Sequence, residues 1–344
     1  EAVVNAAGMW ARELGGQVGA TVPLHAAEHF YIVTEAVEGI SPTMPVLRDQ
    51  DGSGYFKEDA GKLLVGWFEP VAKPWGMKGI SEEFSFTSLP EDFEHIAPLV
   101  ENATHRMPLL AQTGIRLFFN GPESFTPDDR YLLGEQPEVP GLFVAAGFNS
   151  IGIQSSGGAG KVLSEWIVNG HPPLDLWDVD IRRFHSFQGN SQYLKERTEE
   201  TLGLLYAMHW PFRQPETSRG VRKSVLHDRL EKAGACFGEM CGWERANWFA
   251  QAGDDTSLEA TETWDRAGPW EARIREECEA VRDNCGVLDL PGFSRFWVQG
   301  EGADNWLRGF CTGGIPKAGR MNLVYVSDSR GRILTELSCL RLGE

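Results

Sequence analysis

A short apolar run that ends in a glycine- and serine-rich segment is the strongest chemical signal in the chain. The run Leu142–Ala146 has the pattern of a buried strand, and a helix is predicted from about Ala159 to Val168. Between them lie Gly147, Phe148, Asn149, Ser150, Ile151, Gly152 and Ile153. Small residues let the backbone approach a flat ligand, and the helix would aim its N-terminal N–H groups at it. A flavin, whose reduced form is negative near N1, suits this arrangement; a plain strand-to-helix turn is the alternative.

The glycines at the start of that helix do not make a primary ADP-binding motif. Gly158 and Gly160 match the beginning of G-x-G-x-x-G, but Leu163 occupies the third glycine position. No acidic residue ends a second strand about 20 residues further on within a βαβ unit. If a flavin is bound, we therefore expect its ADP-binding segment to lie before Glu1.

His29 and Tyr31 lie two residues apart in the segment 28–35, whose residues alternate like those of a strand. Side chains two apart on a strand share a face. A phenol beside an imidazole could hold a substrate amine in its neutral form or shuttle a proton. The alternative is structural, with a hydrogen-bonded buried tyrosine and a histidine at the surface.

The same segment matches a zinc-protease pattern, which the predicted strand argues against. His25, Glu28 and His29 fit H-x-x-E-H, a motif that needs a helix to bring both imidazoles to one face. Residues four apart on a strand are separated by more than about 10 Å, which is too far to share one zinc ion. We therefore expect no metal site here.

Arg48 is the candidate for binding a substrate carboxylate, because a planar guanidinium can make two parallel hydrogen bonds with such a group. Pairing with Asp49 or Asp51 is the alternative. The segment 121–128 is rich in turn-forming residues and is predicted to be a rigid loop, of a kind that often lines binding sites.

Composition indicates a folded protein without affinity for nucleic acid. The 344 residues are 42% hydrophobic and carry a formal net charge of −17. Because an acidic chain repels phosphate backbones and anionic lipid surfaces, we expect neither nucleic acid nor a membrane as partner. None of the six cysteines forms a C-x-x-C pair. We therefore expect reduced thiols and a cytoplasmic location, or the mitochondrial matrix in a eukaryote.

Three regions follow one another along the chain. Proline and glycine cluster at 171–173 and predict one boundary, and a helical stretch at 271–284 opens a third region. A strand at 292–299, a helix at 303–310 and strands from 321 to 342 are expected to follow. We predict domains at 1–172, 173–267 and 268–344. Both chain ends lie in strand-like sequence, which favours a fragment of a longer polypeptide.

Taken together, these motifs resemble the sarcosine and dimethylglycine dehydrogenase family. The resemblance covers almost the whole chain in matching order, which is far more specific than any single motif. It rests on the segments Val3–Trp10, His29–Thr34, Pro45–Asp49, Asn120–Asp128, Ala146–Ser150, Asp180–His185, Gly242–Arg245 and Val287–Leu290.

The resemblance implies a fold with α/β and α+β parts. In that family, an FAD-binding amine oxidase domain is followed by a small central domain and an aminomethyltransferase-like domain that binds tetrahydrofolate. This chain would hold the C-terminal half of a D-amino-acid-oxidase-like FAD domain with a mixed substrate-domain sheet. The central domain and the start of the folate domain would follow. FAD, and tetrahydrofolate in the third domain, are the implied cofactors.

The implied reaction is oxidative demethylation of an N-methylated glycine, sarcosine or dimethylglycine. A C–H bond next to nitrogen gives up a hydride to the flavin, and the methylene group leaves as formaldehyde or passes to tetrahydrofolate. Electron-transfer flavoprotein or oxygen would accept the electrons. Tyr31 matches the family's active-site tyrosine, with His29 beside it. Flavin contacts are implied at Gly8 and Gly147–Ile153, and Ala7 and Trp10, close to Gly8, are predicted to bind the cofactor as well.

Two departures from the family pattern keep other functions open. Related amine oxidases grip the substrate carboxylate with an arginine in the loop where this chain has Glu123, so Arg48 would have to serve instead. The transferase run G-G-I-x-D-D, which supplies a catalytic aspartate, reads G-R-I-L-T-E at Gly331–Glu336. A folate-dependent aminomethyl carrier and a non-catalytic regulatory homologue are therefore the alternatives.

Overall fold

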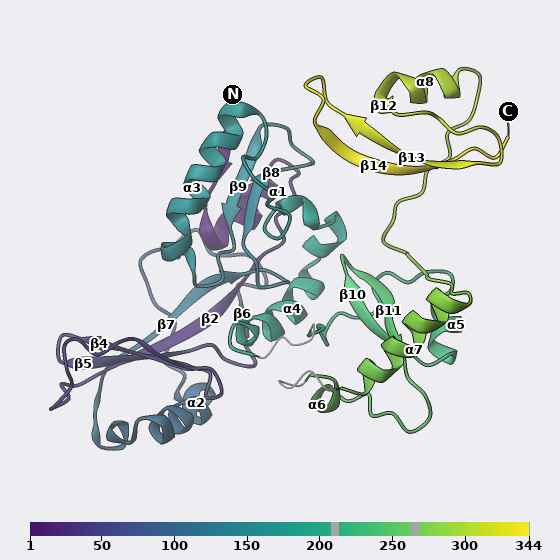
Figure 1. The fold of residues 1–344 in the computed structure, drawn as a ribbon. Coiled ribbons are helices and arrows are strands. Elements are labelled where there is room, and N and C mark those ends of the chain that lie inside the picture. Colours follow the sequence, from purple (N-terminus) through teal and green to yellow (C-terminus); the bar gives the residue numbers. More distant parts are fainter. Residues whose placement is uncertain (208–212, 263–267, 344) are drawn as a thin grey trace. The chain divides into compact units, whose positions relative to one another are not determined.

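A small three-stranded sheet and a larger six-stranded sheet carry the N-terminal half of the molecule. The computed structural model describes residues 1–207, 213–262 and 268–343. In the small sheet, β1 (Val3–Asn5) runs parallel to β9 (Leu142–Ala146), which pairs antiparallel with β8 (Leu132–Glu135). Each strand is short, and all three lie side by side in Figure 1.

Helices pack on both faces of the small sheet. The long helix α3 (Gly152–Asn169) covers one face through Leu163 and Trp166, which meet Phe143. On the other face, the 3₁₀ helix η1 (Gly8–Trp10) leads into α1 (Ala11–Gly16), whose Ala11 joins the core around Leu132 and Val144. Burial on both faces explains why β9 is a continuous apolar run rather than an alternating one.

The larger sheet is built around one long strand. Its strands are β2 (His25–Thr34), β3 (Leu47–Asp49), β4 (Gly54–Asp59), β5 (Lys62–Trp67), β6 (Lys73–Trp75) and β7 (Ile115–Phe125). β2 pairs with β7 along its whole length. On its other edge, β2 pairs with β5 near one end and with β6 near the other. All of these pairings are antiparallel, and β4 joins β3 to β5.

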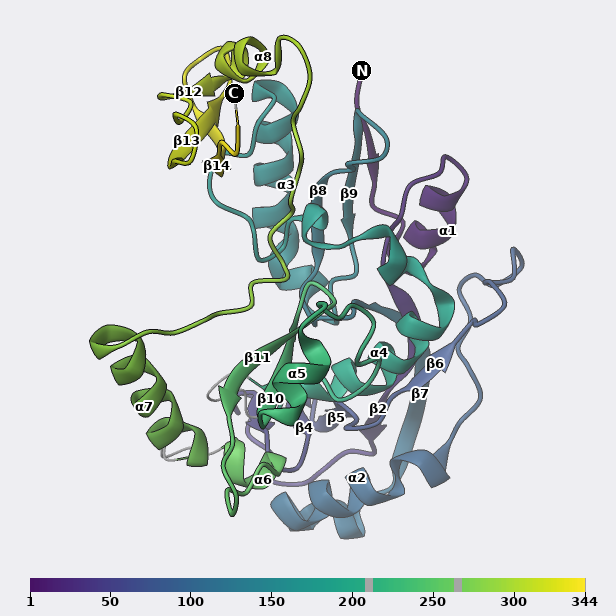
Figure 2. The same ribbon diagram turned by 90° about the vertical axis from the view of Figure 1, so that its right-hand side faces the viewer.

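Helix α2 (Phe93–Arg106) covers one face of the larger sheet in both views (Figure 1; Figure 2). Its apolar side packs against Phe30, Ile32 and Trp67 in the sheet. Because successive side chains of a strand point to opposite faces, this packing turns His29 and Tyr31 to the other face. The alternation predicted for 28–35 is therefore present, and it places the two candidate residues side by side.

Helix α4 (Ser191–Leu204) covers the end of that second face. Its Leu202 packs with Phe68 and Phe125, and the backbone N–H of Ala72 donates to the carbonyl of Glu199 at 2.9 Å. These contacts hold the 68–72 loop after β5 against the sheet. The other helices and strands before Gly292 are η2 (Pro108–Gln112), η3 (Ile181–Arg183), η4 (Ser186–Gly189), α5 (His227–Lys232), β10 (Ala235–Met240), β11 (Trp243–Phe249), α6 (Leu258–Thr261) and α7 (Pro269–Asp283).

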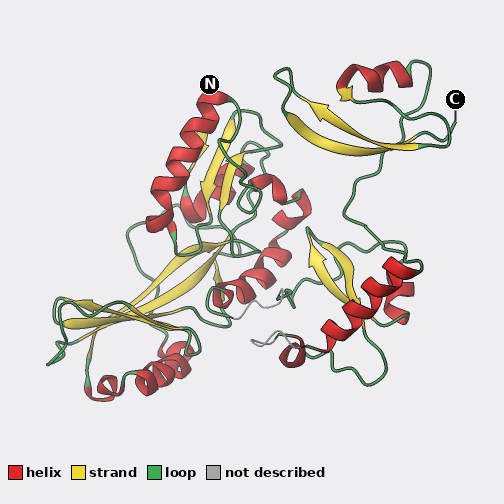
Figure 3. Ribbon diagram, in the orientation of Figure 1, coloured by secondary structure: helices red, strands yellow, loops and turns green. Residues whose placement is uncertain are grey.

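The chain divides into two compact units, of which the first spans Glu1–Gly292 and the second begins at Phe293. Within the second unit, an antiparallel sheet is made of β12 (Cys311–Thr312), β13 (Met321–Ser327) and β14 (Ile333–Leu340). Helix α8 (Ala303–Phe310) leads directly into β12. Figure 3 shows the strands of this unit in yellow and its helix in red.

Three local predictions are wrong. Helix α3 begins at Gly152 rather than near Ala159, so the end of the glycine-rich segment is helical. The segment 121–125 is the end of strand β7 rather than a loop, and Pro122 is tolerated there because β7 pairs only with β2 among the described strands. No described residue of 292–299 is in a strand. The helices predicted at 271–284 and 303–310 are confirmed as α7 and α8.

Candidate functional site

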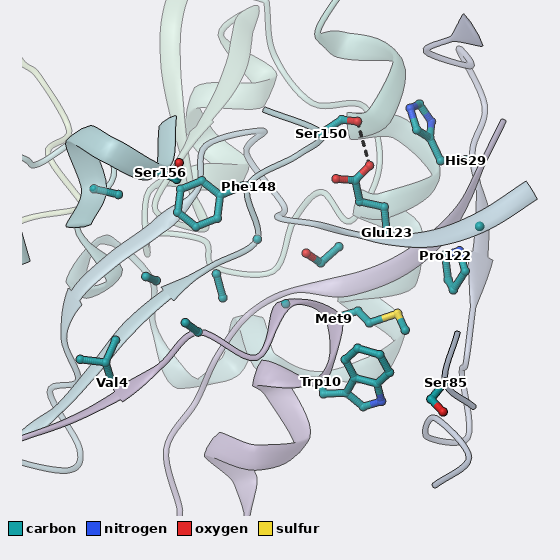
Figure 4. A pocket seen from close by; sticks show the side chains of 18 of the residues that line it. Val4, Met9, Trp10, His29, Ser85, Pro122, Glu123, Phe148, Ser150 and Ser156 are labelled. Carbon is teal, nitrogen blue, oxygen red and sulfur yellow. Dashed lines mark hydrogen bonds between the residues drawn. The ribbon is translucent and has the colours of Figure 1, made fainter. Parts of the chain in front are cut away.

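A cavity of about 1030 Å³ lies where the face of the larger sheet that carries His29 and Tyr31 meets the small sheet and the start of α3. Strands β2, β4 and β7 supply one wall, and η1 together with the turn after β9 supplies the other. Figure 4 shows Phe148 beside Ser156 at the left of this space, Trp10 beside Met9 below it, and Glu123 and His29 at the upper right. Most of the lining is apolar, as is usual for sites that bind small molecules.

A row of rings and one glycine crosses the sheet wall of the cavity. Phe119, Tyr31, Gly66 and Tyr55 lie opposite one another on β7, β2, β5 and β4. The rings of Tyr31 and Phe119 are stacked with centroids 4.7 Å apart. A Cβ atom at Gly66 would lie only 2.2 Å from the Tyr55 hydroxyl oxygen. Glycine at this position therefore allows Tyr55 to lean across β5 towards Tyr31.

His29 lies on the same face of β2 as Tyr31, two residues earlier in the strand. Its imidazole faces the buried carboxylate of Glu69. Its Nδ1 lies 3.4 Å from Oε2 of Glu69, which is an ion-pair contact too loose for a well-aligned hydrogen bond. Burial opposes a charge on the imidazole, but the Glu69 carboxylate and the charge of Glu123 outweigh it and raise the pKa of His29 above its ordinary value of 6.5. The ring packs against Phe68 and Phe125, with centroids 5.0 and 6.0 Å away.

The turn after β9 is held in an unusual backbone conformation. Gly147, Asn149 and Ser150 all have positive φ angles, of 64°, 49° and 64°. Each left-handed residue other than glycine costs about 1–2 kcal/mol. Asn149 offsets this cost because its side-chain oxygen accepts a hydrogen bond from the backbone N–H of Thr126 at 2.9 Å. Strain of this kind, fixed by surrounding contacts, is often found at ligand sites.

A hydrogen bond joins the turn to the sheet wall. The Ser150 hydroxyl donates to Oε2 of Glu123 at 2.7 Å (Figure 4). Ser150 lies on the turn before α3, whereas Glu123 lies on β7. Since both residues line the cavity, this contact fixes the distance between its two walls.

Removing this contact should loosen the turn without unfolding the chain. We expect Ser150→Ala to lower the free energy of unfolding by about 1 kcal/mol, the usual net value of one hydrogen bond. Urea unfolding followed by tryptophan fluorescence measures the change. Ser156→Ala is the matched control, because its hydroxyl donates within α3 to the carbonyl of Ile153. Equal losses in the two variants would contradict a bracing role for Ser150.

The cavity brings together several of the predicted site residues and leaves out others. Those that line it are His29, Tyr31, Gly8, Trp10, Gly147, Phe148 and Ser150. Ala7, Asn149, Ile151, Gly152 and Ile153 do not line it. Of these, Ala7 packs into the core of the small sheet, Asn149 braces the turn, and Ile151 is the N-cap of α3. Ile153 is 97% exposed on α3.

The structure does not bring Arg48 to the described lining of the cavity. Its Nε donates to the Tyr206 hydroxyl at 3.0 Å, and its guanidinium lies over the same ring, 4.7 Å from the centroid. Among the described residues, Arg48 forms no ion pair with Asp49 or Asp51 either, and the Asp49 carboxylate pairs with Arg106 at 2.7 Å. Among the described lining residues, His29 is the only side chain that can carry positive charge.

Two acidic residues and a tyrosine were missed as site residues by the sequence analysis. Tyr55 and Glu123 line the cavity, and Glu69 lies behind His29. Tyr55 lies in strand β4, so its side of the sheet could have been inferred once β4 was paired with β5 and β5 with β2. For Glu69, which lies between Phe68 and Pro70 in a loop, no local pattern indicates that the side chain is only 1% exposed.

No site for a metal ion is found among the described residues, where no three histidine, cysteine or acidic side chains are grouped as ligands. β2 is a strand, as the interpretation of the H-x-x-E-H match required. The described chain also contains no helix that is long and apolar enough to cross a membrane.

The turn and the helix behind it fit a flat ligand with a negative edge. The N-cap of α3, Ile151, provides no side-chain acceptor, and the first turn of α3 contains no acid. Among the described residues, no side chain caps the N–H groups at this end, and such groups favour an anionic partner. Gly8 has a φ of 57° and open space where a Cβ would be. Together with the apolar rings of Trp10 and Phe148, this lining suits an aromatic ring system such as a flavin.

Comparison with known families accounts for nearly the whole chain. Residues 1–166 match the family model "FAD dependent oxidoreductase", and residues 169–224 match "FAD dependent oxidoreductase central domain". Residues 226–344 match "GCVT N-terminal domain". The order of the three matches agrees with the three-part organisation expected from the sequence. The exact domain limits stay a prediction, since these ranges come from family models.

Curated relatives match most of this chain. The 4-methylaminobutanoate oxidase (formaldehyde-forming) of Paenarthrobacter nicotinovorans is 45% identical over 301 residues, covering 88% of this chain and 36% of that protein. Mitochondrial sarcosine dehydrogenase of Homo sapiens is 37% identical over 330 residues, covering 89% and 36%. The mitochondrial pyruvate dehydrogenase phosphatase regulatory subunit of Mus musculus is 36% identical over 303 residues, covering 87% and 34%. The chain spans about a third of the length of these relatives.

The family matches thus show an FAD-dependent oxidoreductase domain followed by a central domain and a GCVT-type domain. The chain belongs to the family of the sarcosine and dimethylglycine dehydrogenases. This confirms the resemblance found in the sequence and the fold class expected from it. FAD is the cofactor of the matched domain.

Proposed function

We propose that the protein oxidises a small N-methyl amino acid, with FAD as the hydride acceptor. The observation that supports this most is one cavity in which the Tyr31 and His29 wall faces the turn at Gly147–Ser150. When bound, FAD supplies a ring that accepts a hydride, which is one proton with two electrons, from the C–H bond next to nitrogen. Gly8, Trp10, Gly147 and Phe148 are the residues that would hold this ring.

The side chains of the cavity can recognise both ends of a zwitterionic substrate. His29, with its raised pKa, offers positive charge to a carboxylate. Glu123 lines the same cavity and offers negative charge to an ammonium group. A raised pKa favours the imidazolium, which cannot accept a proton, so we assign His29 to binding rather than to base catalysis. Tyr31 would orient the amine from the adjacent position on β2.

The length of the substrate is the finer part of the proposal. An N-methylated glycine, sarcosine or dimethylglycine, is the substrate that the family resemblance implies. One relative is named for 4-methylaminobutanoate, in which the carboxylate is further from the nitrogen. Because the two charged groups of the cavity are fixed on different strands, His29 on β2 and Glu123 on β7, substrate length should decide which compound binds both.

The fate of the methylene group and of the electrons belongs to the same proposal. The match to a GCVT-type domain is consistent with transfer of the methylene group to tetrahydrofolate, and release as formaldehyde is the other outcome. Electron-transfer flavoprotein or oxygen is proposed as electron acceptor.

Anaerobic reduction of the flavin tests this function. We expect the full-length gene product, mixed in turn with sarcosine, dimethylglycine, 4-methylaminobutanoate and proline betaine, to lose its oxidised-flavin absorbance with at least one N-methyl amino acid. The compound with the highest reduction rate at low concentration identifies the substrate length. If the protein carries stoichiometric flavin and none of these compounds reduces it, the proposal is contradicted and a regulatory homologue is favoured.

A further inference from the structure

Glu69 is a buried carboxylate without hydrogen-bonding partners among the described residues. It lies in the loop after β5 and is 1% exposed, and neither of its carboxylate oxygens has a hydrogen bond there. Removing an ionised carboxylate from water is strongly unfavourable unless an opposite charge compensates it. A buried carboxylate such as Glu69 is therefore expected to have a positively charged partner.

The only ion-pair partner of Glu69 among the described residues is His29. The imidazole is held between Phe68 and Phe125, and its Nδ1 is buried against the acid. In such an apolar surrounding, the attraction between opposite charges is stronger than in water. Because Nδ1 is buried and His29 lines the cavity, the ring edge that remains available to the cavity carries Nε2.

The other ionisable groups around His29 come from three strands. Glu123 on β7 adds a second negative charge, while Tyr31 on β2 and Tyr55 on β4 present phenols. Burial raises the pKa of Tyr55, so this phenol stays neutral. No lysine or arginine is among the described residues that line the cavity. The charges that face His29 therefore favour its protonated form.

We propose that Glu69 is a positioning residue, which fixes the Nδ1 edge of His29 and keeps the imidazole charged so that Nε2–H points into the cavity as the donor for a substrate carboxylate. This inference rests on the proposed function for the identity of the carboxylate. The raised pKa of His29 agrees with it. Glu69 itself does not line the cavity, so it acts only through His29.

The position of Glu69 is set by packing from a distant part of the chain. Tyr206 stacks on Phe68 with centroids 4.7 Å apart, and Leu202 of α4 belongs to the same core. The backbone contact between Ala72 and Glu199 closes the other side of the loop. The acid is therefore held by the sheet and by α4 rather than by its own side-chain contacts.

Binding of methoxyacetate to the full-length flavoprotein tests the inference without turnover. In this compound an ether oxygen replaces the amine of sarcosine, so it offers a carboxylate but cannot be oxidised as an amine. Flavin absorbance changes give its Kd from about pH 6 to about pH 9. In the wild type, we expect Kd to rise as pH increases through the pKa of His29. In Glu69→Gln, this rise should begin about one pH unit lower, so that Kd is about tenfold higher above both midpoints.

Glu28→Gln is the matched control. Glu28 precedes His29 on β2 but points to the other face, where its carboxylate pairs with Lys73 at 3.5 Å and accepts from Asn120 at 2.7 Å. The same chemical change there should leave the pH dependence of methoxyacetate binding unaltered. If the Glu69→Gln variant also keeps the wild-type dependence, the positioning role is wrong.

Two further variants keep the test decisive if Glu69→Gln does not retain flavin. Glu69→Asp preserves the charge and should give a smaller displacement of the rise in Kd. His29→Gln should remove that rise from the wild-type profile, and its persistence would overturn the inference. The two proposals fail separately. If no N-methyl amine reduces the flavin but the rise in Kd begins at lower pH in Glu69→Gln, only the proposed function is rejected. If an N-methyl amine is oxidised but the rise in Kd is not displaced, only the role of Glu69 is rejected.

Discussion

Replacing His29 by glutamine in the full-length protein is expected to lower kcat/KM for the N-methyl amino acid substrate about 100-fold. The substitution removes the only described lining side chain that can carry positive charge. A hydrogen bond to a charged group contributes about 1.5–3 kcal/mol, which corresponds to a factor of roughly 10 to 100. Since binding is lost more than chemistry, most of the change should appear in KM. Stopped-flow reduction of the flavin at several substrate concentrations separates the two.

The pH dependence should change together with the rate. The pKa of His29 is raised in the folded protein, so the imidazolium and its contribution are present below 6.5 and are lost as pH rises through the folded pKa. In the wild type, kcat/KM should therefore fall as pH rises through the folded pKa of His29. The His29→Gln variant has no such group, and its profile should be flat there except for the deprotonation of the substrate itself.

His25→Gln is the control for this prediction. His25 lies four residues earlier on β2 and lines a different, smaller cavity. Burial and the charge of Arg12 lower its pKa to about 4, so it is neutral at working pH. We expect its replacement to change kcat/KM less than about twofold. A His29→Gln variant with wild-type KM and a wild-type pH profile would show that another group binds the carboxylate.

The parts of the site that could be predicted are those that depend on short-range periodicity. Alternation in 28–35 was enough to place His29 and Tyr31 on one face of a strand, because the side-chain period of a strand is two residues. The buried run 142–146 and the glycine after it likewise located the turn of the cavity. These features follow from a few neighbouring residues and do not require the rest of the fold.

The parts that could not be predicted depend on contacts between distant segments. Glu69 looks like an ordinary loop acid in the sequence, and its burial follows from packing of α4 and Tyr206, more than 120 residues later. Arg48 is drawn away from the cavity by the same residue, Tyr206. Local reasoning thus placed His29 and Tyr31 on one wall of the cavity, whereas the position of Arg48 depends on its contact with Tyr206.

The start of α3 illustrates a similar limit. Glycine lowers helix stability by about 1 kcal/mol relative to alanine, and Gly152, Gly157, Gly158 and Gly160 all lie in this helix. Propensity therefore favoured a later start, near Ala159. The structure starts the helix seven residues earlier, and packing of its later residues Leu163 and Trp166 against Phe143 offsets the cost. An early start places the N-terminus of α3 directly after the turn at Gly147–Ser150.

Replacing Gly147 by alanine is expected to disrupt this turn and with it the retention of FAD. At a φ of 64°, alanine costs about 1–2 kcal/mol, and its Cβ would lie only 2.6 Å from Cγ2 of Thr126. Thr126 is fully buried, and its hydroxyl donates to the carbonyl of Arg130 at 2.8 Å, so it cannot rotate away without losing that bond. Overpacking of this kind adds about 1–3 kcal/mol.

We therefore expect Gly147→Ala to lower the free energy of unfolding of this chain by about 2–5 kcal/mol in urea. The full-length variant should lose flavin during gel filtration. Gly157→Ala is the matched control, since Gly157 is helical and nothing lies within 4 Å of its added Cβ. That change should be neutral or stabilise the protein by up to about 1 kcal/mol. Full flavin content in Gly147→Ala would mean that the turn does not hold the cofactor, because a displaced Gly147 backbone cannot keep close contact with a bound ring.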